Sequence, residues 1–207
     1  RPPRSTLFPY TTLFRSNSTH MDINQIIDHI GKLPEASKNT LKEIISEVTY
    51  PKGHILFKAD KVETKVYFIK KGIVRAYTEL ADNEITFWFG REGDTVVSMK
   101  SYVSNQRGYE NIELLEECEL YEMKKQSLHE LFGKDIHIAN WGREFAEQEL
   151  LKTEERFIGR QFKTSLERYR DLMNHTPDLL QRVQLGYIAS YLGITQVSLS
   201  RIRAKFR

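Results

Sequence analysis

The side chains best suited to recognition chemistry lie close to the C-terminal end of the chain. If residues 195–203 form a helix, its outward face consists of polar and basic side chains with one valine among them. Gln and Arg can make paired hydrogen bonds to base edges in a DNA major groove, whereas Ser and Lys suit phosphate groups. The sequence therefore predicts a DNA-binding face made of Gln184, Thr195, Gln196, Val197, Ser198, Ser200, Arg201, Arg203 and Lys205.

Two short helices are needed to present this face, and the sequence from 184 to 203 favours them. Ala189 is small where two helices must cross closely, Gly193 can adopt the positive φ of a tight turn, and the Thr195 hydroxyl can cap the second helix. An ordinary helical hairpin with a solvated basic face is the alternative. The combined pattern favours a helix-turn-helix that is packed together by Ile188, Leu192, Ile194, Leu199 and Ile202.

The charge distribution favours a polyanion as the partner of this end of the chain. The formal net charge is +3, but residues 156–207 carry ten Lys and Arg against three Asp and Glu. Residues 21–155 carry 18 basic and 25 acidic residues. An acidic front and a basic C-terminal quarter indicate two domains, the second of which meets a polyanion.

Upstream of the basic region, the sequence from about residue 48 has the texture of a β-structure. Short runs rich in β-branched and aromatic residues alternate with turns that contain Gly, Pro, Asp or Asn. Closely spaced strands of this kind predict an antiparallel sandwich or barrel. The predicted strands are 53–57, 65–69, 73–77, 84–89, 111–115 and 118–123, and helices are expected before them at 22–33 and 37–46.

A long helix is predicted from 136 to 156, between the β-rich part and the basic part. Ile138, Trp141 and Phe145 recur at three- and four-residue spacing, which places them on one face. Such a stripe either packs into the core of its own chain or is buried against a second copy, and the sequence leaves both readings open. These three residues are the candidate dimer interface.

Five motifs are found between Met21 and Arg207: Tyr187-Ile-Ala-Ser-Tyr-Leu-Gly-Ile-Thr195, Leu199-Ser-Arg-Ile-Arg203, Lys52-Gly-His-Ile-Leu-Phe57, Tyr67-Phe-Ile69 followed by Gly72, and Gly93-Asp94. Through these motifs the chain resembles the Crp/Fnr family of transcription regulators. The resemblance implies an α+β fold: an N-terminal antiparallel β-roll (a double-stranded β-helix of the cyclic-nucleotide-binding type) with flanking helices, a long dimerisation helix, and a C-terminal helical domain with a winged helix-turn-helix. Because the sequence ends at Arg207, little room for a wing is expected.

The resemblance and the changes of texture divide the chain into four parts. Residues 21–132 form the effector domain, 133–156 the dimerisation helix and 157–207 the DNA-binding domain. Residues 1–20 precede the first methionine and resemble translated adapter sequence, so they are interpreted as a non-native tail.

The β-roll departs from the members of this family that bind cyclic AMP. The resemblance implies an Arg and a hydroxyl residue in the phosphate-binding segment, because a cyclic phosphodiester needs a bidentate guanidinium and hydrogen-bond donors. Gly108 and Tyr109 stand at those positions, and Arg107 lies one residue away. Cyclic AMP is therefore not expected as a ligand. An unidentified small-molecule effector is the alternative, with Ser98, Arg107, Gly108 and Tyr109 as candidate pocket residues.

Other ligands and enzymatic activity find little support. A single cysteine, Cys118, excludes an all-cysteine zinc or iron–sulfur site within one chain, and the six histidines are scattered singly. The sequence contains neither a Gly-rich phosphate loop nor a nucleophile elbow. No metal, no identified cofactor and no enzymatic activity are predicted.

These observations predict a bacterial, cytoplasmic, sequence-specific DNA-binding regulator that acts as a homodimer on a two-fold symmetric site. The expected partners are double-stranded DNA, a second copy of the chain and RNA polymerase, and no apolar run is long enough to expect a membrane. Gln196 and Val197 stand where family members that read the best-known half-site carry Arg-Glu, so the target sequence should differ. The alternative is a ligand-binding β-roll whose helix-turn-helix serves protein contacts.

Overall fold

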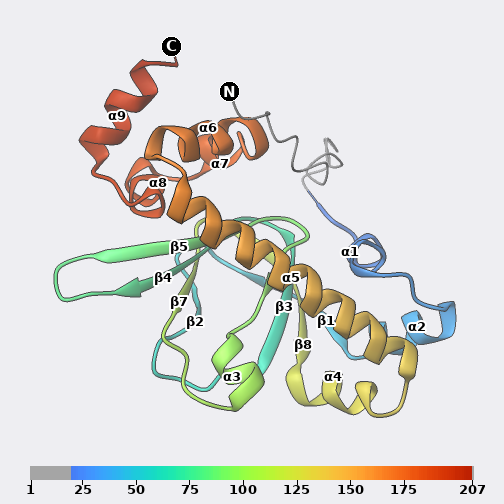
Figure 1. The fold of residues 1–207 in the computed structure, drawn as a ribbon. Helices are drawn as coiled ribbons and strands as arrows, with labels where there is room; N and C mark the ends of the chain where they lie inside the picture. Colours follow the sequence, from blue (N-terminus) through green and yellow to red (C-terminus); the bar gives the residue numbers. More distant parts are fainter. Residues whose placement is uncertain (1–19, 207) are drawn as a thin grey trace.

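The computed structural model describes residues 20–206, in which two antiparallel sheets are flanked by helices (Figure 1). One sheet has the strand order β1-β8-β3-β6 and the other β2-β7-β4-β5. The predicted tail, residues 1–20, lies outside the described residues except for His20. The strands are β1 (Ile45–Tyr50), β2 (Ile55–Phe57), β3 (Lys65–Lys71), β4 (Val74–Glu79), β5 (Glu84–Gly90), β6 (Thr95–Val96), β7 (Asn111–Leu114) and β8 (Cys118–Lys124).

The two sheets enclose an apolar core because alternate residues of each strand point inward. On β8, Cys118 and Leu120 face the space between the sheets, whereas Tyr121 and Met123 face the helices outside it. Leu114 of the second sheet is fully buried in the same core. The predicted antiparallel β-roll is therefore confirmed.

One predicted boundary near the start of the roll was wrong. The helical spacing predicts a second helix to residue 46, but α2 (Glu35–Glu43) ends with Ile44 as its C-cap, and β1 begins at Ile45. Residues 45–50 pair with β8 in unbroken antiparallel register, from Ile45 opposite Met123 to Tyr50 opposite Cys118. A long-range partner strand thus overrides the local helical spacing of the isoleucines.

Three short helices and the first part of a long one cover the outer face of β3 and β8. These are α1 (Ile23–Ile30), α2, α4 (Lys125–Phe132) and the beginning of α5 (Ile136–Phe162). Asp22 begins α1 with a reciprocal capping box to Gln25. A further short helix, α3 (Met99–Ser104), lies in the segment that joins β6 to β7 (Figure 1), and its Tyr102 ring packs against His129 of α4 with 5.0 Å between ring centroids.

The long helix packs the three candidate dimer-interface residues against their own chain. Ile138 and Trp141 are 0% and 3% exposed because they pack into the apolar cluster beneath α1 and α2, and the indole N–H of Trp141 donates a hydrogen bond to the Ile27 carbonyl at 3.0 Å. Phe145 is half-buried and stacks on Trp141. The stripe Ile138, Trp141 and Phe145 therefore belongs to the core of its own chain. Ile138 and Trp141 have no free surface for a partner.

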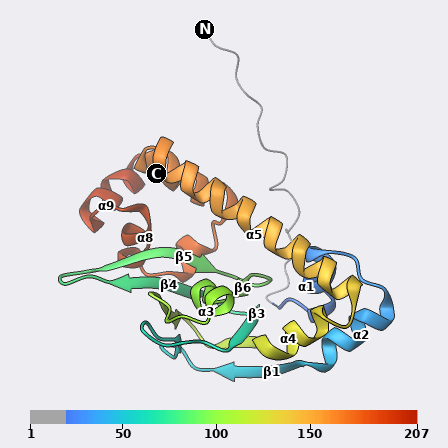
Figure 2. The same cartoon turned by 60° about the horizontal axis from the view of Figure 1, so that its bottom comes forward.

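The C-terminal part is helical and lies against one edge of the roll. It consists of the end of α5, which runs six residues past the predicted boundary at 156, and of α6 (Ser165–His175), α7 (Leu179–Arg182), α8 (Leu185–Leu192) and α9 (Gln196–Ala204). No strand follows α9 within residues 20–206. Figure 2 shows α5 as a rod across the molecule, with the roll beneath it and the C-terminal helices at its far end.

A single apolar cluster joins the C-terminal helices to the roll. Ile73, Phe89 and Leu115 of the roll pack with buried side chains of α6 and α8, including Tyr169 and Ile188. The predicted boundary at residue 157 separates two sequence textures, but the structure joins both sides through this shared core. None of the helices in the described part of the chain is both long and apolar enough to cross a membrane.

Candidate nucleic-acid interface and effector site

A tight turn at Gly193 joins α8 to α9. Gly193 adopts the left-handed conformation (φ 66°, ψ 37°), and the Ile194 N–H donates a hydrogen bond to the Ala189 carbonyl at 3.0 Å. Any other residue would be strained at this φ, which explains the glycine. Thr195 then caps α9, because its hydroxyl accepts a hydrogen bond from the Ser198 N–H at 3.1 Å.

The apolar side chains expected between the two helices are found there. Ile188, Ala189, Leu192 and Leu199 are each no more than 2% exposed, and Ile194 and Ile202 pack against them. Ala189 allows a close approach of the helices because it carries only a methyl group. Buried contacts on the inner side leave the opposite side of α9 to solvent.

That opposite side carries most of the predicted DNA-binding face. Ser198 and Arg203 are half-buried, and the other seven members of the predicted set are exposed. Gln196, Val197, Ser200 and Arg201 share one side of α9, because residues three and four apart are neighbours on a helix. The arginines that form ion pairs within residues 20–206 are 75, 91, 143 and 182, so the Arg201 guanidinium has no carboxylate partner there.

The amide of Gln196 has a neighbour that the sequence analysis missed. A β-carbon at Gly186 would lie 2.8 Å from the Gln196 Nε2 atom, so this side chain packs directly over the backbone of α8. A larger residue at 186 would push the amide away. The glycine therefore helps to set where Gln196 points.

The C-terminal helices contact the roll through Ser190, which no sequence pattern marked. The Ser190 hydroxyl accepts a hydrogen bond from the Thr86 N–H at 2.9 Å and donates one to the Glu84 carbonyl at 2.9 Å. These backbone groups belong to β5, the outer strand of its sheet. One side chain of α8 thus satisfies two groups that an edge strand leaves unpaired.

A buried arginine beneath α8 strengthens this contact. The Arg75 guanidinium carbon lies 4.1 Å from the ring centroid of Tyr77 on its own strand and 3.8 Å from that of Tyr187 on α8. The side chain is 1% exposed, so its charge must be balanced locally. Its nitrogens bind the Thr86 hydroxyl at 2.9 Å, the Glu113 carboxylate at 3.3 Å and the Glu84 carboxylate.

A second charged contact joins α7 to two turns of the roll. Arg182 forms ion pairs with Glu92 at 2.8 Å and with Glu116. Burial opposes ionisation of the Glu92 carboxyl, but hydrogen bonds from Arg182 and from the Gly72 N–H outweigh it and lower the pKa of Glu92. Nearby, Arg91 pairs with Asp178 at 2.9 Å.

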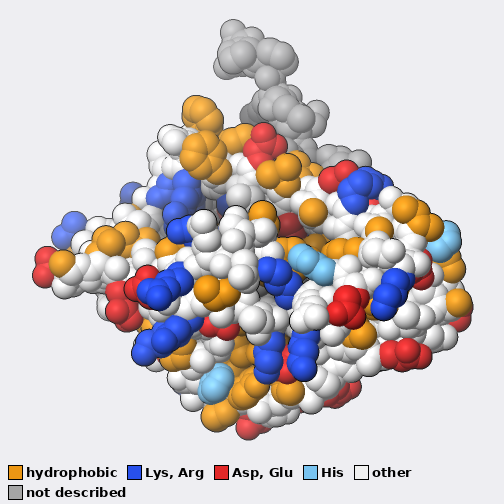
Figure 3. Space-filling model, turned by 90° about the horizontal axis from the view of Figure 1, so that it is seen from below, with side chains coloured by type: hydrophobic (Ala, Val, Ile, Leu, Met, Phe, Trp, Pro, Cys, Tyr) orange, Lys and Arg blue, Asp and Glu red, His pale blue; other side chains and the backbone are white. Residues whose placement is uncertain are grey.

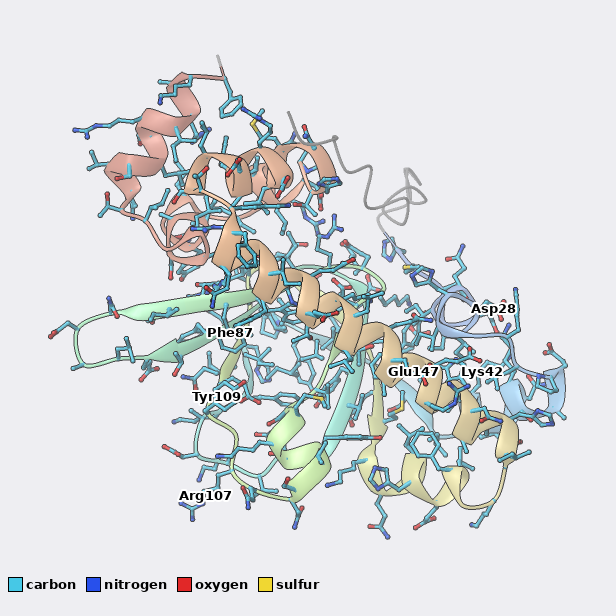
Figure 4. The ribbon with its side chains drawn as sticks, in the orientation of Figure 1. Asp28, Lys42, Phe87, Arg107, Tyr109 and Glu147 are labelled. Atoms are coloured by element: carbon cyan, nitrogen blue, oxygen red, sulfur yellow. The ribbon has the colours of Figure 1, made fainter. Side chains whose placement is uncertain are left out.

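The candidate effector residues come only partly together. Ser98 is 2% exposed, and a β-carbon at Gly108 would lie 2.7 Å from its hydroxyl oxygen. Arg107 points away from the roll into solvent, and exposed Tyr109 lies beside Phe87, with 6.1 Å between ring centroids (Figure 4). The structure therefore brings Ser98 and Gly108 together and separates Arg107 from them.

A carboxylate that the sequence analysis did not select completes this cluster. Glu110 is 7% exposed, accepts a hydrogen bond from the Tyr109 N–H at 3.0 Å, and has its Oε1 atom 3.1 Å from where a β-carbon of Gly108 would be. An acidic group thus lies next to Gly108, the position at which the resemblance implies an arginine. Figure 3 views the molecule from below, where basic, acidic and apolar side chains are interspersed without forming a continuous basic surface.

Cys118 and the histidines do not form a further site. Cys118 is fully buried in the core between the sheets, and this burial raises the pKa of its thiol to about 12. A thiol held protonated at neutral pH is a poor nucleophile. Within residues 20–206, no group of three His, Cys, Asp or Glu side chains is placed to hold a metal ion.

Comparison with known proteins defines the fold class. Residues 47–135 match the family model of the cyclic nucleotide-binding domain. No match was found among curated protein sequences. The structural neighbours include Crp/Fnr-type regulators, and at identities below 25% their likeness shows the fold alone.

Three of these neighbours span most of the chain. FixK2 from Bradyrhizobium japonicum is 22% identical, with 78% of this chain and 84% of that chain covered and a TM-score of 0.68. The c-di-GMP-responsive global regulator CLP from Xanthomonas campestris is 17% identical, with 84% and 91% covered and a TM-score of 0.65. The catabolite activator protein of Thermus thermophilus is 16% identical, with 87% and 85% covered and a TM-score of 0.54.

The cyclic nucleotide implied by the matched domain does not fit the residues present. A cyclic phosphodiester carries a negative charge, and the buried Glu110 carboxylate lies beside Ser98 and Gly108, two of the candidate effector residues from the phosphate-binding segment that the resemblance implies. The negative charges of a phosphodiester and of a neighbouring carboxylate repel each other strongly in a poorly solvated site. An arginine at 108 would also collide with the Ser98 hydroxyl.

Proposed function

We propose that this chain is a DNA-binding transcription regulator of the Crp/Fnr type. The observation that carries the proposal is the exposed side of α9, where Gln196, Ser200 and Arg201 stand on a helix fixed by the Gly193 turn and the Thr195 cap. In a helix-turn-helix, the second helix enters the major groove with its N-terminal residues at the base edges. Bidentate contacts from Gln196 and Arg201 would read sequence there.

The DNA-binding proposal can be tested by selection from random duplexes followed by footprinting. We expect an enriched site with two-fold symmetry and with half-sites about 34 Å apart, one helical turn of DNA. The double variant Gln196→Ala with Arg201→Ala should lose the selectivity and keep weak, salt-sensitive binding. Selection that enriches no sequence would support the alternative, in which α8 and α9 serve protein contacts.

We propose further that the regulator is a homodimer with its seam on the C-terminal half of α5. Leu150 and Leu151 are 71% and 52% exposed, and Phe157 and Ile158, seven residues later, are 62% and 45% exposed. Phe162 at the end of the helix is 82% exposed. A seven-residue apolar repeat is the spacing with which two helices pack along each other. The seam thus lies beyond the stripe at 138–145 that the core of the chain takes up.

A regulator of this kind would act in the cytoplasm. Its effector would not be a cyclic nucleotide held by an arginine, because Gly108 stands at the position where family members that bind cyclic AMP carry that arginine. The Glu110 carboxylate supports this part of the proposal. Because α8 and α7 are docked on the roll through Arg75, Ser190 and Arg182, any ligand that moves the roll edge would also move α9.

A further inference from the structure

A hollow of about 240 Å³ opens at the junction of the roll, the end of α5 and the α8–α9 turn. It is the place where the three parts of the molecule meet, as the positions of β5, α5 and α8 in Figure 1 show. The hollow is separate from the cluster around Ser98 and Glu110 inside the roll. Its lining consists of Ile85, Arg160, Arg168, Ser190, Tyr191, Leu192 and Gly193.

The two arginines of this hollow carry uncompensated charge. Neither Arg160 nor Arg168 forms an ion pair with a carboxylate of residues 20–206, and no acidic residue lines the hollow. In contrast, Arg75 and Arg182 also lie at the contact between roll and helices, and they bind two and three carboxylates, respectively. The junction hollow is therefore the part of this interface where positive charge is left without a counterion.

The hydrogen bonds of Arg168 explain its fixed position. Its terminal nitrogens donate to the Lys163 carbonyl at 2.7 Å and to the Leu192 carbonyl at 2.6 Å, so the guanidinium joins the ends of α5 and α8. Its Nε atom is buried and has no hydrogen-bond partner among the described residues. A fixed cation whose partners are all uncharged raises the local potential without being neutralised.

Arg160 is the more exposed arginine of the pair and, in the described part of the chain, the one with free donor atoms. It is exposed, and within residues 20–206 only its Nη2 atom donates hydrogen bonds, to the Thr86 carbonyl at 3.3 Å and the Tyr191 carbonyl at 3.4 Å. Both bonds are long for this type. Its Nη1 and Nε atoms are left to bind a ligand in the fork geometry that suits carboxylate and phosphate.

The remaining walls are largely apolar. The Tyr191 ring lies 5.9 Å from the Arg160 guanidinium, and Ile85 and Leu192 line the hollow with it. Apolar walls with a few convergent charges are typical of small-molecule sites. We propose that the junction hollow binds a small organic anion, with its carboxylate or phosphate on Arg160 near Arg168 and an apolar body against Tyr191 and Ile85.

Occupancy of this hollow would act on the DNA-binding helices, a consequence that rests on the proposed function. Ser190 and Gly193 line the hollow and belong to α8 and to the turn before α9, while Ile85 belongs to the roll. The site would give the protein an effector position outside the roll, whose own phosphate-binding segment is occupied by Glu110. The same anionic chemistry has a second source, a phosphate of bound DNA.

Calorimetry and thermal unfolding of the full chain with phenyl phosphate test the site in the absence of DNA. We expect saturable binding and a melting temperature raised by about 2–4 °C near saturation, with no effect of uncharged phenol. Arg160→Gln should weaken binding about 10- to 100-fold, because it removes hydrogen bonds to a charged group. Arg156→Gln, one turn earlier on α5 and outside the lining, is the matched control and should bind as the wild type does.

A second arm separates the two sources of anion. If phenyl phosphate does not bind but Arg160→Gln alone lowers the salt dependence of DNA binding by about one phosphate contact, the anion is a DNA phosphate. If Arg160→Gln matches Arg156→Gln in both measurements, the site is overturned. Binding of phenyl phosphate by a protein that fails to bind DNA would refute the proposed function and leave the site intact.

Discussion

In the proposed mechanism, Arg201 contributes most to the recognition of the DNA base sequence. It is exposed on the same side of α9 as Gln196 and has no carboxylate partner in the described part of the chain. Arg201→Ala should cost about 1–3 kcal/mol of binding free energy and relax the preference at one base pair. Competition binding with single-base variants of the selected site measures this directly.

Lys205→Ala is the matched comparison for Arg201. Lys205 is exposed at the end of α9, where a phosphate contact is expected. Its loss should weaken binding equally on all sequences and make the salt dependence shallower by about one charge. If Arg201→Ala behaves in this uniform way as well, Arg201 contacts phosphate and another residue reads the base.

Glu110 leads to a prediction about the roll. Cyclic AMP and cyclic GMP should show no micromolar binding by calorimetry, because the buried carboxylate repels their phosphate and Gly108 supplies no guanidinium. Glu110→Gln removes the charge at nearly constant shape and should at most restore weak binding. Micromolar affinity of the unaltered chain for either nucleotide would contradict this account of the roll.

The residues that the sequence identified correctly are those with local signatures. Gly193 and Thr195 are recognisable because a positive φ and a helix cap are properties of a few consecutive residues. The burial of Glu110 and the packing of the Gln196 side chain have no such local signature in the sequence. The burial of Glu110 and the packing of Gln196 on Gly186 depend on how distant or separately folded segments meet.

The contact between α8 and β5 belongs to the scale of elements, and Ser190 is its most testable part. Ser190→Ala would remove both hydrogen bonds to β5 and leave the Thr86 N–H and the Glu84 carbonyl without them. We expect a loss of about 1–3 kcal/mol in the stability of this contact. Hydrogen exchange should show faster exchange of the Thr86 amide, while Ser200→Ala on the exposed side of α9 should leave it unchanged.

Unaltered protection of Thr86 in Ser190→Ala would mean that Arg75 with Tyr187 and the apolar cluster around Phe89 hold β5 and α8 together without the Ser190 hydrogen bonds. No sequence pattern could have revealed this contact, because Thr86 and Ser190 are separated by 104 residues. Both residues also look unremarkable in their own segments. The sequence predicted β5 and α8 as separate elements, and their docking follows from surfaces that only the folded chain brings together.

The ion pair between Glu92 and Arg182 predicts that the contact of α7 with the roll weakens in acid. The pKa of Glu92 is lowered from its ordinary value of 4.5, so the ionised carboxylate stabilises the folded state fully above that value. The contribution is lost as the pH falls below 4.5 and through the lowered pKa. Urea unfolding between pH 3 and 7 should show this loss as a lower free energy of unfolding in acid. The Glu92→Gln variant should be less stable than the wild type at pH 7, and its free energy of unfolding should depend less on pH over the acid range.

At the scale of the whole molecule, the apolar residues of α5 show where the sequence reading was ambiguous. A stripe at three- and four-residue spacing marks a buried face but not the surface that buries it. Ile138 and Trp141 are covered by α1 and α2 of the same chain, whereas Leu150 and Phe157 lie beyond the reach of these helices and are exposed. The same helix thus packs one half into the core and leaves apolar side chains of the other half exposed, which is the basis of the proposed seam.

The last prediction concerns this division of α5. Leu150→Asp with Phe157→Asp should give a folded monomer, because both side chains are exposed and their loss leaves no cavity. DNA affinity should fall steeply with the dimer, since one recognition helix contacts too few base pairs for a specific site. Trp141→Asp, in contrast, should unfold the chain, because the indole is buried and hydrogen-bonded to Ile27. Light scattering gives the mass of each variant, and circular dichroism shows whether it is folded.

A dimer that survives both substitutions on α5 would place the seam elsewhere. A wild-type monomer that protects a single half-site would remove the dimer from the mechanism.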